Sequence, residues 1–244
     1  MKRRILVIFL LINFLFRASS HAGSYVTSQI LDSYVLGAGF QIYDRPVIQT
    51  EVGHIFENGF GLSVWGSLPA SLNDVGANAG TEVDLNVWYS FNPVTVGAAY
   101  YCMSPGTFSS IGNDIFQVNA EVSKKVLIGN GIFLTPCFRA EYNFPADDDH
   151  CSETTGLYLI PSISLAYELN DQVRISLKNK AECDMGGYGA DKALIMILAP
   201  NFSFKISETL SANVGVNIYL PAIKTDDDIR KNLYVPYLGV SYSF

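Results

Sequence analysis

The chain has 244 residues, of which 49% are hydrophobic and 16% charged, and its formal net charge is −7 at pH 7. An acidic chain lacks the basic surface that nucleic acids bind, so we expect no nucleic-acid partner. Only residues 5–16 form a long apolar run, whereas a helical membrane span needs about 20 apolar residues. The high apolar content is divided into short pieces, and helical membrane proteins are therefore excluded.

The N-terminus has the pattern of a secretory signal peptide. Basic residues at 2–4 precede the apolar run 5–16. In Ser20-His21-Ala22, the first and last residues are small, as a cleavage site needs. We predict that residues 1–22 are a signal peptide removed after Ala22, and an uncleaved anchor is the weaker alternative because the run is short. The mature domain, 23–244, would then have a formal charge of −11, since four basic residues are lost.

The rest of the chain alternates between apolar and polar residues with a period of two. The alternation is clearest in 83–91, 116–123 and 210–220. Alternate side chains of an extended strand face opposite sides, so each of these segments has one apolar and one polar face, whereas a helix would repeat every 3.6 residues. We predict twelve strands, at about 33–42, 47–56, 60–68, 81–91, 94–103, 114–124, 132–144, 156–169, 173–183, 193–206, 210–220 and 233–244.

The strand lengths and connections favour a membrane barrel over a soluble sandwich. Most predicted strands have about ten residues, as membrane strands do, whereas soluble strands centre on five or six. Short turns alternate with long polar connections, and the one short outer connection is 43–46. Outer-membrane barrels have short periplasmic turns and long extracellular loops. We therefore predict an all-β, transmembrane antiparallel β-barrel of about 12 strands in the bacterial outer membrane of a Gram-negative cell.

Charged residues in the predicted strands share one face. If the apolar face contacts outer-membrane lipid, the charges point into the barrel, and Glu168 lies opposite Arg174 across the turn at 170–172. A Lys or Arg facing lipid at mid-bilayer would cost about 2–4 kcal/mol, which explains the segregation. We predict that the pore-lining residues are Glu82, Asp84, Trp88, Glu121, Arg139, Glu141, Glu168, Arg174, Lys178, Lys180 and Glu182.

The last strand ends in aromatic residues on its apolar face. Tyr242 and Phe244 resemble the C-terminal signal that the barrel-assembly machinery recognises, so we expect this machinery as a partner during biogenesis. Aromatic residues at other strand ends, such as Tyr89 and Tyr142, suit the girdles at the membrane interfaces.

Cysteines and acidic loops give weaker signals. The four cysteines match no zinc spacing, and free thiols are at least as plausible as disulfides, although Cys151 and Cys183 could form a disulfide between outer loops. The aspartate runs at 147–149 and 226–228 could gather Ca²⁺, but such runs are usually solvated. We expect no cofactor and no resident metal.

Several segments resemble the TorF-type porin family of exported barrels. The resemblance lies within residues 34–89, about the first third of the mature chain. The matching segments are Asp44-Arg45-Pro46-Val47-Ile48-Gln49, Asn58-Gly59-Phe60, Val64-Trp65-Gly66-Ser67 and Glu82-Val83-Asp84-Leu85. The resemblance implies passive solute passage and no catalytic residues.

Three functions remain open from the sequence. The first is a porin-like channel for small polar solutes or ions, because a twelve-stranded barrel has a lumen between those of filled eight-stranded barrels and wide porins. The second is a non-conducting surface barrel, plugged by salt bridges, that acts through its acidic loops. The third, a barrel lipase or protease, is least favoured, because His54 and His150 have no partners at triad spacing. The solute and the oligomeric state stay open.

Overall fold

The structure, a computed structural model, describes residues 23–71, 81–102, 114–146, 155–188, 193–223 and 231–244. Its elements are β1 (Gly23–Leu31), β2 (Tyr34–Leu36), the 3-10 helix η1 (Gly37–Gly39), β3 (Phe40–Tyr43), β4 (Val47–Ile55), β5 (Phe60–Pro69), β6 (Glu82–Phe91), β7 (Val94–Cys102), β8 (Ile115–Ser123), β9 (Val126–Gly129), β10 (Ile132–Pro145), β11 (Gly156–Glu168), β12 (Val173–Met185), β13 (Ala193–Lys205), β14 (Leu210–Ile223) and β15 (Leu233–Ser243). None of the helices in these residues is long and apolar enough to cross a membrane.

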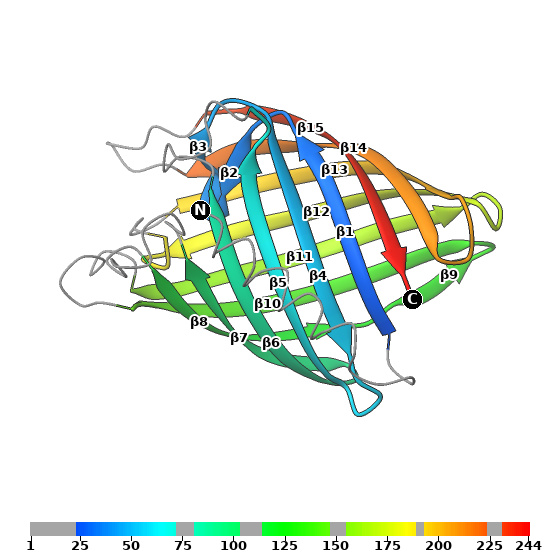
Figure 1. Cartoon of the computed structure of the whole chain (residues 1–244), viewed down its shortest axis with the longest axis horizontal. Helices are drawn as coiled ribbons and strands as arrows, with labels where there is room; N and C mark the ends of the chain where they lie inside the picture. Colours follow the sequence, from blue (N-terminus) through cyan, green and yellow to red (C-terminus); the bar gives the residue numbers. More distant parts are fainter. Residues whose placement is uncertain (1–22, 72–80, 103–113, 147–154, 189–192, 224–230) are drawn as a thin grey trace, which may run out of the picture.

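The main sheet closes on itself. Each strand pairs antiparallel with its neighbours, and β1 pairs with both β4 and β15. β8 and β9 are successive parts of one barrel strand, because both pair with β10. Over the described residues, the sheet is therefore a closed, twelve-stranded antiparallel β-barrel with tilted strands (Figure 1).

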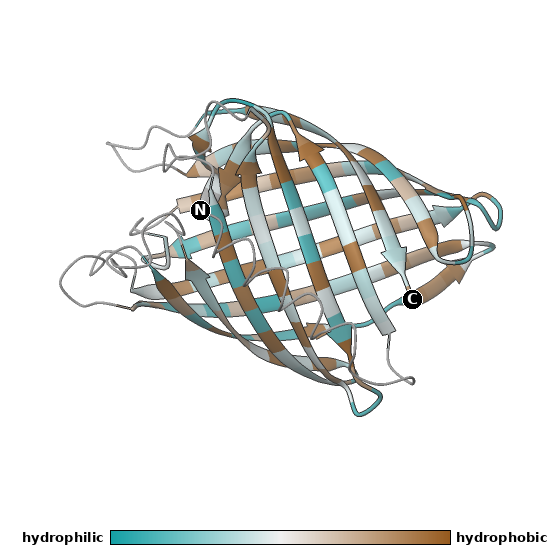
Figure 2. Cartoon of the chain, in the orientation of Figure 1, coloured by the Kyte–Doolittle hydropathy of each residue, from teal (hydrophilic) through white to brown (hydrophobic). Residues whose placement is uncertain are grey.

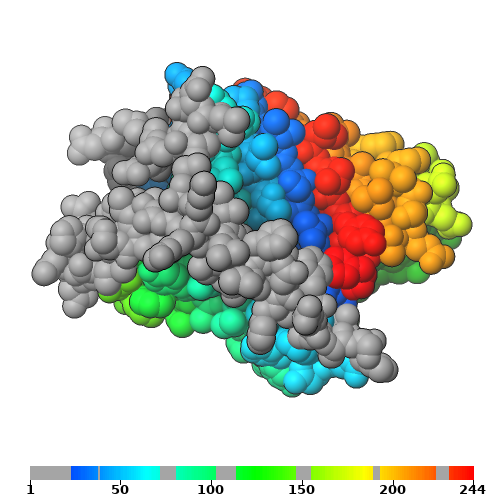
Figure 3. All heavy atoms as spheres, in the orientation of Figure 1, coloured from blue at the N-terminus to red at the C-terminus, as the bar shows by residue number. Residues whose placement is uncertain are grey.

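The seam of the barrel joins its first and last strands. The Ser24 amide donates to the Phe244 carbonyl, and the Phe244 amide donates to the Ser24 carbonyl, each at 2.9 Å. The space-filling view shows β1 and β15 side by side along this seam (Figure 3). Lipid offers no hydrogen bonds to an open sheet edge, so closure at this seam is the condition for a sheet to span a bilayer.

Alternation along the strands gives the barrel two different faces. On β6, Leu85, Val87 and Tyr89 are exposed on the outside, whereas Glu82 and Asp84 are buried on the inside. The same alternation of hydrophobic and hydrophilic residues runs along most strands (Figure 2). The outer face is therefore apolar without being covered by protein, which is the opposite of a soluble sheet.

Short turns and long connections lie at opposite ends of the barrel, and the C-terminus lies at the short-turn end (Figure 1). Local chemistry fixes the short turns. At the β4–β5 turn, Asn58 Oδ1 accepts a hydrogen bond from the Phe60 amide at 3.0 Å. Gly59 has a φ of +88°, and a Cβ there would lie 2.4 Å from the Ser90 carbonyl oxygen, so only glycine fits.

Eleven of the predicted strands are confirmed as barrel strands, but the first one is wrong. The first barrel strand is 23–31, and the segment predicted as a strand at 33–42 forms the small hairpin β2–η1–β3 in a separate sheet. The short outer connection predicted at 43–46 is also wrong, because the whole of 32–46 connects β1 to β4.

The first strand escapes prediction because its outer face is partly polar. Ser24 Oγ lies 2.8 Å from His54 Nδ1, and Ser28 Oγ lies 3.0 Å from Thr50 Oγ1, so these outward polar groups satisfy one another across β1 and β4. The hydrogen bonds lower the cost of polar groups on an apolar face. They also remove the contrast between faces that marks the other strands.

Candidate functional site

The candidate site is the barrel interior. The residues predicted to line it all lie at inward positions of their strands: Glu82, Asp84, Trp88, Glu121, Arg139, Glu141, Glu168, Arg174, Lys178, Lys180 and Glu182. Two pairs of them, Glu121 with Arg139 and Glu168 with Arg174, lie directly opposite each other on neighbouring strands. Trp65 and Tyr101 also lie inside, where they line cavities. The structure places these side chains, and their role in a pore is a proposal.

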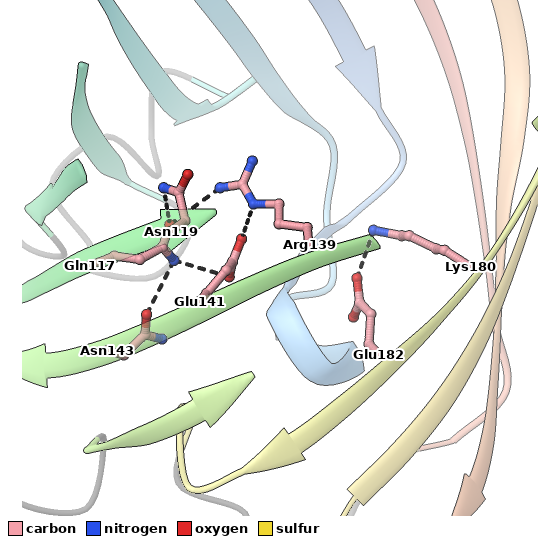
Figure 4. Close-up of polar contacts among 7 residues, drawn as sticks. All are labelled: Gln117, Asn119, Arg139, Glu141, Asn143, Lys180 and Glu182. Atoms are coloured by element: carbon pink, nitrogen blue, oxygen red, sulfur yellow. Dashed lines mark hydrogen bonds and ion pairs between the residues drawn. The ribbon is translucent and has the colours of Figure 1, made fainter. Parts of the chain in front are cut away.

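A polar cluster joins β8 to β10 (Figure 4). The Arg139 Nε lies 2.5 Å from Glu141 Oε1 in an ion pair, and Arg139 Nη2 donates to Gln117 Oε1 at 3.3 Å. The amide of Gln117 in turn donates to Glu141 Oε2 at 3.0 Å and to Asn143 Oδ1 at 3.1 Å. Glu141 is almost fully buried, so this set of partners compensates for the loss of water around its charge.

A second charge pair follows the same rule on β12. Lys180 Nζ lies 2.6 Å from Glu182 Oε1, two positions along the same strand, and this pair also points into the interior (Figure 4). In both pairs the acid lies nearer the long-connection end than the base. The charges on this part of the wall are therefore largely neutralised within each strand.

The short-turn half of the lumen is open to water. Arg174 and Lys178 lie on the inner face of β12 and are nevertheless exposed. Glu168 lies opposite Arg174 in the register, as predicted, and Glu168 Oε1 forms an ion pair with Lys125 Nζ at 3.7 Å. A cavity of about 810 Å³ lies here, with Glu168, Arg174 and Lys205 in its lining. Exposed charges inside a closed barrel require solvent in the lumen.

The hairpin β2–η1–β3 fills part of the long-connection half. Near the seam, Tyr34 packs in a buried apolar cluster with Leu31, Val47, Leu233 and Val235. These partners come from β1, β4 and β15, so one side of the hairpin is held by the strands that close the barrel.

The other side of the hairpin reaches the wall formed by β11 to β13. Phe40 packs against the buried cluster of Tyr158, Ile195 and Ile197. At η1, Gly39 has a φ of +75°, and a Cβ there would lie 2.5 Å from Ile195 Cδ1. This close approach needs glycine, because any side chain would push the hairpin away from the wall.

Open space, called the passage below, remains between the hairpin and the wall on the side of β4 to β8. A cavity of about 220 Å³ is lined there by Tyr34 together with Trp65, Glu82, Asp84 and Tyr101. A second cavity, of about 460 Å³, lies against the same wall, and Trp65, Asp84 and Tyr101 line both. The two cavities therefore adjoin, and the Tyr34 hydroxyl, which donates to Glu82 Oε2, fixes the hairpin at their edge.

Sequence reasoning missed the part of the site that the hairpin makes. Two glycines, Gly37 and Gly39, interrupt the segment predicted as the first strand. Glycine weakens a strand interior and marks a bend or a close backbone approach, so this pair was the available signal.

Several predictions fall on residues that the structure does not describe. The signal peptide at 1–22 and the aspartate runs at 147–149 and 226–228 lie outside the described residues, as do Cys151 and His150. The disulfide between Cys151 and Cys183 therefore stays a prediction. Across the described ranges, no group of three or more His, Cys, Asp or Glu residues could hold a metal ion.

Comparisons with known proteins bear on the fold. No protein-family model and no curated protein matches the chain. Among solved structures, the KdgM porin matches with a TM-score of 0.52 and 12% identity over 91% of this chain and 99% of that one. The closed antiparallel barrel is therefore a fold that this chain shares with that protein. The NanC porin matches with a TM-score of 0.52 and 11% identity over 90% of this chain and 98% of that one. A second KdgM structure, with disordered oligogalacturonate bound, has the same TM-score of 0.52 and 12% identity over 91% of this chain and 99% of that one.

Proposed function

We propose that this protein is a channel of the bacterial outer membrane that passes small polar solutes or ions without an energy source. One observation carries the proposal: inward-facing Arg174 and Lys178 are exposed inside a closed barrel whose outer face is apolar. A barrel that served only as a filled scaffold would bury such charges against partners. A solvated lumen in an apolar wall is instead what passage of polar solutes needs.

The outer surface supports the location in a membrane. Large exposed apolar residues occur on every side of the barrel, including Leu68, Val118, Ile163, Phe202 and Leu238. A soluble protein rarely exposes so large a continuous apolar surface. Together with the predicted signal peptide, this surface supports export to the outer membrane.

The end of the chain supports assembly by the barrel-assembly machinery. Tyr242 and Phe244 are exposed on the outer face, with ring centroids 5.3 Å apart, at the short-turn end of the seam strand. The proposed C-terminal signal is therefore accessible from outside the barrel.

The resemblances point the same way. The TorF-type motifs imply solute passage, and the structures that share the fold are porins by name. The oligogalacturonate of KdgM would not suit this chain. The cavity beside the hairpin of this chain is lined by Glu82 and Asp84, and their carboxyl groups would repel an acidic sugar.

The main competitor is a non-conducting barrel. The hairpin and the two ion pairs, Arg139–Glu141 and Lys180–Glu182, favour it because they fill part of the lumen. The adjoining cavities along β4 to β8 favour the channel, since they leave space in the lumen beside the hairpin.

An enzyme has less support. Ser24 hydrogen-bonds to His54 Nδ1, but in a catalytic triad the serine bonds to Nε2 and a carboxylate bonds to Nδ1. His54 Nε2 has no hydrogen-bond partner in the described part of the chain, so this pair lacks the triad arrangement.

The experiment is single-channel recording of the refolded barrel in planar lipid bilayers. We expect discrete conductance steps from folded protein, identified by its heat-modifiable migration in gels. The matched control is the same preparation after thermal unfolding, which should give none. Folded protein that inserts into the bilayer and gives no steps would refute the channel and favour the plugged barrel.

A further inference from the structure

We propose that Glu82 and Asp84 form a binding site for a permeating inorganic cation beside the hairpin, and that this site makes the channel select cations over anions. The inference rests on the proposed channel function and names the class of solute that the part of the lumen beside the hairpin would bind. The occupant is a small monovalent cation such as K⁺ or Na⁺.

The two carboxyl groups lie together in the passage. Glu82 and Asp84 are two positions apart on the inner face of β6, and only 3% and 8% of their surfaces are exposed. Their side chains interact with each other, and Glu82 also accepts the hydroxyl of Tyr34. The hairpin therefore holds one carboxyl group in place at the edge of the 220 Å³ cavity.

One oxygen of this pair is buried beside the two cavities without a hydrogen-bond partner among the described residues. Asp84 Oδ1 is buried and has no hydrogen-bond partner in the described residues, although Asp84 lines both cavities. A buried carboxylate oxygen without a donor is costly, and in native proteins a bound water or ion commonly satisfies such a group. Asp84 therefore offers a ligand oxygen that the described protein groups leave unsatisfied.

The pair also lacks a basic neighbour. Two other buried acids of the inner face, Glu141 and Glu182, are neutralised by ion pairs with Arg139 and Lys180. Across the described ranges, no ion pair joins a Lys or Arg to Glu82 or Asp84. Two carboxyl groups in contact cannot both stay ionised without a positive charge between them, which is either a proton or a cation.

The surroundings extend the negative potential along the passage. Glu51 of β4 lines the second cavity together with Asp84 and accepts the Tyr25 hydroxyl at 2.8 Å. Arg139 lines the same cavity, but its ion pair with Glu141 at 2.5 Å cancels most of its charge. Beside the hairpin, a cation would therefore meet a row of carboxyl groups, whereas the exposed bases Arg174 and Lys178 lie in the wide short-turn half.

The ligand chemistry fits a weakly held monovalent ion. Carboxylate oxygens are ligands of hard cations, but two carboxyl groups supply far fewer oxygens than the 6–8 of a dedicated Ca²⁺ site. The 220 Å³ cavity has room for an ion with several waters, at about 30 Å³ each. Conduction requires binding that is weak enough for release, and this incomplete shell provides it.

The test is the reversal potential of single channels in a KCl gradient. We compare the wild type with Glu82→Gln/Asp84→Asn, which keeps the size of both side chains and removes both charges. The matched control is Glu168→Gln, an inner-face carboxyl in the wide short-turn half. We expect the wild type and the control to prefer K⁺ over Cl⁻, and the double variant to lose roughly tenfold of that permeability ratio.

Asp84→Asn alone is the second variant, because the double change also alters the partner of Tyr34. It should lose part of the preference while the heat-modifiable migration of the folded barrel stays unchanged. A wild-type channel without cation preference, or a double variant that keeps the preference, would overturn the cation site and leave the channel standing. A wild type that gives no conductance would overturn both.

Discussion

An arginine that replaces Val87 should destabilise the barrel, whereas an arginine that replaces the preceding residue, Asn86, should have little effect. Val87 lies on the outer face of β6, is 46% exposed, and pairs with Leu62 and Ala98. A charge there would face hydrocarbon near the middle of the strand, at a cost of about 2–4 kcal/mol. Since 1.4 kcal/mol is a factor of ten, Val87→Arg should raise the ratio of unfolded to folded protein by roughly thirty-fold to several hundred-fold.

Asn86 lies one position away but faces inward. It lines the 460 Å³ cavity and is two positions from Asp84 on the same face. An arginine there has both space and an acidic partner, so Asn86→Arg should change the free energy of unfolding by less than about 1 kcal/mol. Both variants introduce the same side chain at neighbouring positions of β6, and the main difference between them is the face of the barrel that carries it.

The assay is reversible urea unfolding in lipid vesicles, followed by the fluorescence of Trp65 and Trp88, both of which lie inside the barrel. We expect a lowered midpoint with an unchanged slope for Val87→Arg only. Equal losses for the two variants, or a larger loss for Asn86→Arg, would refute the assignment of the faces and with it the apolar exterior.

Three further predictions concern the lumen. Replacement of residues 33–44 by a short Gly-Ser linker should raise single-channel conductance, because the hairpin occupies part of the lumen; an unchanged conductance would show that it does not limit the flow. Glu141→Gln should lower the free energy of unfolding by about 1–3 kcal/mol in the urea assay, because it leaves a charged partner without its ion pair, whereas exposed Glu168→Gln should change it by about 0.5 kcal/mol or less. Gly39→Ala should cost about 1–3 kcal/mol of hairpin packing, because of the φ of +75° and the contact with Ile195, and should make the hairpin cleavable by protease in vesicles; resistance equal to that of the wild type would contradict this packing.

Most of the barrel could be predicted from the sequence because lipid acts on one face of every strand. The outer positions of β14 and β15 are apolar over their whole length, as in Val214 and Leu238, while the inner positions away from the hairpin carry mostly small and polar residues, such as Asn213 and Ser241. This contrast comes from a single physical cause, the cost of polar groups in hydrocarbon, and it is strong enough to read without any contact information.

The hairpin could not be predicted by the same reasoning. Alternation reports that one face of a segment is apolar, but it does not report what that face meets. Tyr34 and Phe40 look like lipid-facing residues in the sequence, yet they pack against the inner wall at Leu31 and Ile195. Only the tertiary structure separates the two cases.

The charge partners were also beyond the sequence. The alternation of side chains along a strand predicted that Arg139 and Lys180 face inward. It did not predict that each would form its ion pair with an acid on the same strand, Glu141 and Glu182 respectively. Glu168 and Arg174 are opposite in register as predicted, and side-chain rotamers then decide which neighbour each charge contacts.

The position of the hairpin has a consequence for the order of assembly. Its residues follow the first barrel strand, whereas the side chains that hold it, such as Ile195 and Val235, come from near the end of the chain. Such distant contacts are slow to form. The hairpin therefore gains its full packing only after the last strands have joined the barrel. Variants that loosen the hairpin should accordingly delay the final step of folding more than the formation of the individual strand pairs.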